Sequence, residues 1–181
     1  MSRAARVVNL VAFQVCWIAF VAGAGRGYPW VGFVPLVLFA AWQLKVSPVR
    51  RADLDLMALA AVLGFAVDTS FVKVGALSYA APFPSAELAP VWIVGMWIAF
   101  SLTLNHAFDF LKHNTLAAIV LGLFGGPIAY GVAAGRFGAV TFEGTAWFGI
   151  ALIGLAWGAV TPLLARIAAH LVARASEPRH A

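Results

Sequence analysis

The sequence predicts an all-α membrane protein, a compact bundle of about six transmembrane helices with both ends in the cytoplasm. Of the 181 residues, 63% are hydrophobic and only 10% are charged, whereas soluble domains carry about a quarter charged residues. A bilayer core about 30 Å thick needs about 20 apolar residues per helix, so six crossings use nearly the whole length. We therefore expect residues 1–181 to form a single transmembrane domain, oriented by its Lys and Arg residues.

Six apolar stretches follow one another with short connections. We expect helices near 7–25, 28–45, 53–72, 90–111, 115–134 and 145–165. The first stretch resembles a signal peptide, because Arg3 and Arg6 precede an apolar run that ends in a small-x-small pattern. Its apolar core is longer than the usual run of about 7–15 residues. We therefore expect it to be retained as the first helix.

Basic residues are divided unequally between the two sets of connections. Nine lie on the side of the termini, namely Arg3, Arg6, Lys45, Arg50, Arg51, Lys112, Arg166, Arg174 and Arg179, and three lie on the other, namely Arg26, Lys73 and Arg136. Cytoplasmic loops retain Lys and Arg, so the sequence predicts that both termini are cytoplasmic in a bacterial-type inner membrane. These residues lie at helix ends and form no patch among aromatic residues, which excludes nucleic acid as the expected partner.

The two longer outer connections differ in composition. Lys73–Ala89 holds Pro82 and Pro84 and is too apolar for a free linker, so we expect it to lie on or dip into the outer membrane interface. Gly135–Gly144 is expected to be a simple solvated turn.

Small residues predict how the helices pack, because close approach replaces the hydrophobic force that lipid removes. Four glycine pairs are spaced four apart: Gly23 and Gly27, Gly122 and Gly126, Gly131 and Gly135, and Gly154 and Gly158. Gly126 precedes Pro127 near the middle of the fifth stretch. Pro127 there indicates either a structural kink or a helix break of the kind that forms ligand sites in transporters.

Polar residues near the inner end of the fourth stretch are candidates for catalysis. Asp109 is three residues from His106 and four from Asn105, so it can orient His106 as a general base. Three polar residues of other stretches could join them: Gln14, Gln43 and Thr161. The alternative is that Asp109 pairs with Lys112 while Asn105 and His106 clamp helices by hydrogen bonds.

Asp68, followed by Thr69, lies near the outer end of the third stretch and therefore far from His106. We expect Asp68 to pair with Lys73, or with Arg26 or Arg136. The alternative is a carboxylate that binds a proton or a lipid headgroup beneath the outer loop.

Two acids open the third helix, and the soluble-enzyme signatures are missing. Asp53 and Asp55 are expected to favour the helix N-terminus through its dipole. The sequence has no metal-ligand cluster, phosphate loop or dinucleotide fingerprint. We therefore expect neither a metal nor a cofactor.

The chain resembles an uncharacterised family of small bacterial inner-membrane proteins, known only as a domain of unknown function. The resemblance is carried by Phe13-Gln14-x-x-Trp17, Arg51-Ala52-Asp53-Leu54, Gly64 with Asp68-Thr69, Pro90-x-Trp92 with Trp97, Thr103-Leu104-Asn105-His106 and Gly125-Gly126-Pro127-x-Ala129-Tyr130. It implies a single-domain polytopic protein and favours a link to lipids. It supplies no activity, cofactor or catalytic residue.

Three functional hypotheses follow from these observations. The first is a lipid-linked accessory protein or enzyme that holds acyl chains between helices, with membrane lipids as partners. The second is a small-solute or proton-linked transporter that uses Asp68 and the break at Pro127. The third is a structural protein that docks a membrane partner or a second copy of itself. The sequence leaves open whether the protein is an enzyme.

Overall fold

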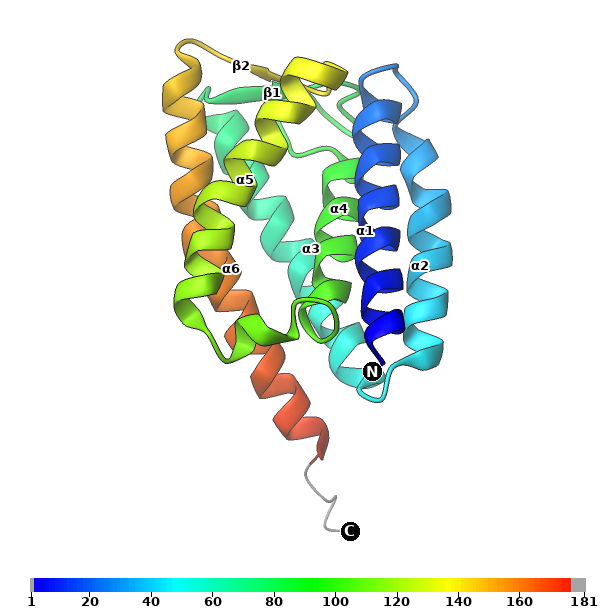
Figure 1. Cartoon of the computed structure of the whole chain (residues 1–181). Coiled ribbons are helices and arrows are strands. Elements are labelled where there is room, and N and C mark those ends of the chain that lie inside the picture. Colours follow the sequence, from blue (N-terminus) through cyan, green and yellow to red (C-terminus); the bar gives the residue numbers. More distant parts are fainter. Residues whose placement is uncertain (1, 177–181) are drawn as a thin grey trace.

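A computed structural model describes residues 2–176 of the chain. Within that range the chain forms six α-helices, two short 3-10 helices and a two-stranded sheet (Figure 1). In chain order these are α1 (Arg3–Ala24), η1 (Pro29–Gly32), α2 (Phe33–Val46), α3 (Arg50–Lys73), β1 (Leu77–Tyr79), α4 (Val91–Leu104), η2 (Asp109–Lys112), α5 (Thr115–Phe137), β2 (Val140–Phe142) and α6 (Ala146–Ser176). The predicted all-helical fold is therefore confirmed.

Five helical segments of residues 2–176 are long and apolar enough to cross a membrane, with η1 and α2 forming one of them. The sixth, α4, has only 14 residues. It is also deeply buried, from Trp92 to Leu104, and packs against α1, α2, α3 and α6. The chain is thus a multi-pass membrane protein built around α4, with apolar side chains such as Val62 and Leu116 covering its outer surface.

The two ends of the bundle are built differently (Figure 1). At one end, which we call the sheet end, β1 pairs antiparallel with β2, with Ser78 opposite Thr141. Ala139 and Val140 are buried there, so the prediction of a simple solvated turn at 135–144 is wrong. Strands of three residues are too short to show an alternating pattern. The opposite end, which we call the N-terminal end, holds the start of α1 and the turns before α3 and α5.

The fourth predicted helix, 90–111, is shorter than expected because α4 ends at Leu104. Asn105 and His106 follow in a turn that leads into η2. Successive residues of a helix point about 100° apart, so a continued helix would direct these two side chains to different neighbours. The turn instead directs both to Asp53.

Glycines set the packing of α5 against α6. A Cβ on Gly126 would lie 2.7 Å from Trp157 Cγ, and a Cβ on Gly154 would lie 3.1 Å from the Leu123 carbonyl oxygen. That carbonyl belongs to the residue four before Pro127, whose ring nitrogen cannot donate to it. α5 nevertheless continues to Phe137. The predicted pairs at 122/126 and 154/158 therefore lie at a helix contact, whereas Gly131 and Gly135 face open space.

Candidate functional site

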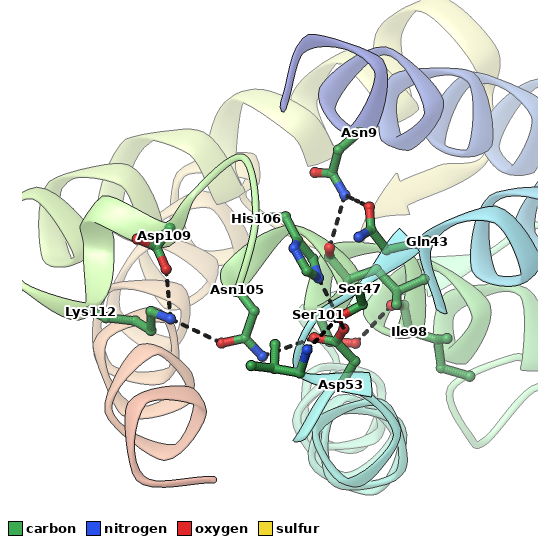
Figure 2. Close-up of polar contacts among 12 residues, drawn as sticks. Asn9, Gln43, Ser47, Asp53, Ile98, Ser101, Asn105, His106, Asp109 and Lys112 are labelled. Carbon is green, nitrogen blue, oxygen red and sulfur yellow. Dashed lines mark hydrogen bonds and ion pairs between the residues drawn. The ribbon is translucent and has the colours of Figure 1, made fainter. Parts of the chain in front are cut away.

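A polar cluster lies at the N-terminal end and is centred on Asp53 of α3 (Figure 2). Its carboxylate is 1% exposed and accepts hydrogen bonds from Ser47 Oγ at 2.5 Å and from Asn105 Nδ2 at 2.9 Å. His106 Nε2 lies 3.0 Å from Asp53 Oδ2. A carboxylate can only accept, so this contact places a proton on Nε2 and leaves Nδ1 unused by Asp53.

A second layer of the cluster lies on η2. Lys112 Nζ donates to Asn105 Oδ1 at 3.2 Å and pairs with Asp109 Oδ1 at 2.6 Å. The pairing of Asp109 with Lys112 confirms one of the two predicted alternatives, and the other, in which Asp109 orients His106, is wrong. Asp53 orients His106 instead, because the turn after α4 directs the ring towards α3. Asp53 lies in the first turn of α3, as expected, and forms this buried cluster in addition. Asp55 lies beyond that first turn and is exposed.

A buried amide pair ties α1 and α2 into the same end. Asn9 Nδ2 donates to Gln43 Oε1 at 2.7 Å and to the Leu102 carbonyl at 3.0 Å (Figure 2). The predicted participation of Gln43 thus takes the form of a clamp between helices, beside the Asp53 cluster. The amide pair thus joins α1 and α2 to the backbone of α4, beside the cluster formed by α3, η2 and the turn between α4 and η2.

A small polar pocket of about 140 Å³ opens beside the Asp53 cluster. It is lined by Arg6, Pro48, Asn105, His106 and Asp109. His106 is only 2% exposed, so it forms part of the wall and is not a free surface residue. The pocket therefore combines a fixed imidazole with the guanidinium of Arg6 from α1.

A much larger cavity, of about 410 Å³, lies between α1, α4, α5 and α6. Small-molecule sites have volumes of roughly 300–1,000 Å³ and mostly apolar walls. Eight aromatic side chains line this cavity: Phe13, Trp17, Trp92, Trp97, Phe100, Phe108, Tyr130 and Trp157. Trp97 and Trp157 stack in its wall, with ring centroids 4.4 Å apart.

The cavity opens to the side, between α1 and α5. The exposed residues in its lining lie on these two helices: Gln14 on α1, and Ile128 and Val132 on α5. α5 meets α1 at the sheet end, where Trp17 contacts Phe137 edge to face, and the two helices diverge below that contact (Figure 1). The opening therefore lies on the apolar outer surface of the helix bundle.

A second buried carboxylate, Asp68, stands behind the cavity wall near the sheet end. It is 0% exposed and accepts hydrogen bonds from the hydroxyls of Tyr79 and Tyr130 and, at 2.6 Å, from Trp97 Nε1. The predicted pairing of Asp68 with a basic residue is therefore wrong. Phenol and indole groups satisfy its charge because the fold brings β1, α4 and α5 together around it.

The other predicted candidates lie in the cavity wall or apart from both sites. Thr69 Oγ1 accepts from the Ala89 backbone at 3.0 Å, which ties the loop between β1 and α4 to α3. Lys73 pairs with Glu87 at 2.9 Å on the surface. Gly126 lines the cavity but Pro127 does not. The Thr161 hydroxyl is buried beside the cavity and has no hydrogen-bond partner in residues 2–176.

Sequence reasoning missed the residues that join the two ends of α3 to their neighbours. Asp53 was not singled out as a site residue because it lies in a first helical turn, where the helix dipole alone explains an acidic residue. Tyr130 and Trp97 carried a signal, because buried Tyr and Trp generally find a partner for their polar atom. Their depth in the fourth and fifth stretches matches that of Asp68 in the third.

These features define a class: a multi-pass α-helical membrane protein with a lateral apolar cavity and a polar pocket at one end. The chain belongs to a family described as "Protein of unknown function (DUF2878)", which matches residues 6–163. This match confirms the family resemblance of the sequence. Comparisons with curated proteins and with solved structures gave no match.

Proposed function

We propose that this protein binds a membrane lipid by holding its apolar chain in the cavity between α1, α4, α5 and α6. The observation that carries the proposal is the lateral opening of an aromatic-lined cavity of about 410 Å³ towards the apolar surface. Water finds few hydrogen-bond partners on such walls, whereas each buried methylene of a lipid chain contributes about 0.8 kcal/mol to the free energy of binding. A lipid chain reaches the opening without leaving the bilayer.

A membrane topology accompanies this proposal. The chain crosses a bacterial inner membrane six times, with α4 and the polar turn after it forming the shortest crossing. The support is the distribution of charge: Arg3, Arg6, Arg50 and Arg51 lie at the N-terminal end, whereas Arg26 lies at the sheet end. By the positive-inside rule the N-terminal end is cytoplasmic. The opening of the cavity then lies within the hydrocarbon layer.

The geometry gives less support to the other two functions. A proton-linked path through Asp68 requires a carboxylate that exchanges protons with water, yet Asp68 is fully buried by three donors. A transport site at Pro127 requires an interrupted helix, yet α5 continues through it. A docking role finds no distinctive surface in residues 2–176 beyond apolar side chains that lipid itself would cover.

The first prediction tests the cavity with a matched pair of substitutions on α5. Gly125 lines the cavity and has room for a side chain, with Leu121 Cδ1 3.6 Å from a built Cβ. Gly125→Phe fills the cavity and should reduce chain binding about tenfold or more, since it displaces several methylenes. Photolabelling with a phospholipid that carries a diazirine in its acyl chain measures this at Met96 and Trp157.

Gly131→Phe is the control, because Gly131 lies on the same helix, faces open space and does not line the cavity. In this variant, Met96 and Trp157 should be labelled as strongly as in the wild type. Equal labelling of Met96 and Trp157 in the two variants would overturn the proposal. So would a wild-type protein whose label appears only on outward residues such as Val62.

A further inference from the structure

The polar pocket and the apolar cavity are lined by different residues of the same two segments, α1 and the turn after α4. On α1, Arg6 lines the pocket and Phe13 lines the cavity. These residues are seven apart, so they lie on one helix face, about 10 Å from each other along the axis. In the other segment, His106 lines the pocket and Phe108 lines the cavity. Along each of these two segments, a residue of the polar pocket is thus followed by a residue of the apolar cavity.

The charges that line the pocket leave one cation unpaired. Asp109 is paired with Lys112, and His106 contacts Asp53. The side chain of Arg6, by contrast, is exposed and has no carboxylate partner in residues 2–176. A guanidinium presents several donors in a plane that matches phosphate and carboxylate oxygens. The pocket therefore favours an anion.

We infer that the pocket binds the anionic headgroup of the lipid whose chain occupies the cavity. This inference rests on the proposed function and adds the class of lipid, an anionic phospholipid. Arg6 contacts the phosphate. His106 lines the pocket beside Arg6 and is held in place by Asp53 through Nε2.

The arrangement fits the way a lipid lies in a membrane. Arg6 is near the first turn of α1, where basic residues meet the headgroup layer of the cytoplasmic leaflet. Phe13 and Trp17 lie further along the helix, at the depth of the acyl chains. One lipid can therefore place its phosphate at Arg6 and direct one chain into the opening between α1 and α5.

The experiment compares two lipids with identical photoreactive chains, phosphatidylglycerol and phosphatidylcholine, on the purified full-length protein in detergent micelles. Phosphatidylcholine carries the same phosphate beside a choline cation, so its labelling of Met96 and Trp157 reports binding of a lipid that has no net headgroup charge. The ratio of phosphatidylglycerol to phosphatidylcholine labelling reports selection for an anionic headgroup. A basic residue near a lipid surface changes binding by about fivefold. Arg6→Gln should therefore lower this ratio about fivefold, chiefly by lowering phosphatidylglycerol labelling.

Arg3→Gln is the matched control, since Arg3 lies on the same helix and is exposed but does not line the pocket. It should retain the wild-type ratio. An equal fall in both variants, or an unchanged ratio in Arg6→Gln, would overturn the headgroup site. Inorganic phosphate should compete with phosphatidylglycerol at Arg6, so a displacement that is equally strong in the wild type and in Arg6→Gln would also overturn it. Absence of label from Met96 and Trp157 with both lipids would instead contradict the proposed function.

Discussion

Asp53 and Asp68 lie near opposite ends of α3, and both carboxylates are buried among three hydrogen-bonding side chains. The partners differ in kind. Asp53 contacts Ser47, Asn105 and His106, small polar or titratable residues of the N-terminal end. Asp68 contacts only phenol and indole groups, those of Tyr79, Tyr130 and Trp97.

Their surroundings also differ. The partners of Asp53 reach a polar pocket and the Lys112 ammonium, so this cluster can respond to an anion. The partners of Asp68 are themselves core residues: Trp97 stacks on Trp157, and Tyr79 packs edge to face on Trp92. A buried charge is costly unless every lone pair is used. The comparison therefore assigns a structural role to Asp68 and a site-forming role to Asp53.

The largest expected effect is that of Asp68→Ala, which removes the acceptor for three buried donors. Each buried donor left without a partner costs about 1–3 kcal/mol. The free energy of unfolding should therefore fall by at least about 3 kcal/mol, and the sheet end should loosen first because Tyr79 belongs to β1. Thermal unfolding in detergent, with proteolysis of the loop at 80–90 as a local readout, measures both effects.

Tyr79→Phe removes only one of the three donors to Asp68 and keeps the aromatic ring, so its effect should be smaller. It should cost about 1.5–3 kcal/mol, the range for a hydrogen bond to a charged group. If Asp68→Ala melts like the wild type, Asp68 does not hold the sheet end and the contrast with Asp53 fails.

The helical fold was predictable because its signals are local. Apolar runs of membrane length identify helices whatever their neighbours. Glycines four apart predicted close packing without naming the helices, and two of the four pairs lie at the α5–α6 contact. β1 and β2 were not predictable, because three-residue strands become stable only through the pairing of Leu77 with Phe142 and its neighbours. The early end of α4 at Leu104 likewise depends on a partner, Asp53, from another helix.

The residues of the site could be predicted from their type, but their hydrogen-bond partners could not. Asn105, His106 and Asp68 were identified as costly polar groups at membrane depth. Their candidate partners came from sequence proximity and from the outer turns: Asp109 for His106, unless it paired with Lys112, and Lys73, Arg26 or Arg136 for Asp68. Tertiary contacts brought Asp53 and Tyr130 closer instead. The apolar cavity gave no sequence signal, because aromatic residues that line a cavity and those that fill a core have the same composition.

A smaller effect on stability is expected for Asp53→Asn. The amide keeps one oxygen that can accept from Asn105, and the cluster borders a polar pocket where water can replace a lost bond. The free energy of unfolding should fall by about 1–2 kcal/mol, less than in Asp68→Ala. Because His106 loses the carboxylate that orients it, the preference for phosphatidylglycerol over phosphatidylcholine should also fall.

Two measurements on Asp53→Asn separate its structural role from its role in the headgroup site. Thermal unfolding reports its structural part, and the labelling ratio reports its part in the site. Asp68→Asn is the matched substitution at the other end of α3 and should lower stability without changing the labelling ratio. A ratio that falls equally in both variants would show that the two clusters do not differ in function.

The smallest effect is expected for Glu87→Gln, at the same end of the bundle as Asp68. The hydrogen bond and charge of Lys73 hold the pKa of Glu87 below its usual value. A depressed pKa in the folded state means that the pair stabilises above the unfolded pKa and loses this contribution as pH falls through the folded one. Glu87 is fully exposed, so solvent screens the pair. Glu87→Gln should therefore leave the melting temperature unchanged at neutral pH.

Melting curves of the wild type and Glu87→Gln at neutral pH and at a pH below the folded pKa of Glu87 measure this directly. Any small difference at neutral pH should vanish at the lower pH, where the wild-type carboxyl is protonated. A fall at neutral pH as large as that of Asp68→Ala would mean that the surface pair with Lys73 anchors the outer loop. The buried Asp68 cluster would then lose the role that distinguishes it from Asp53.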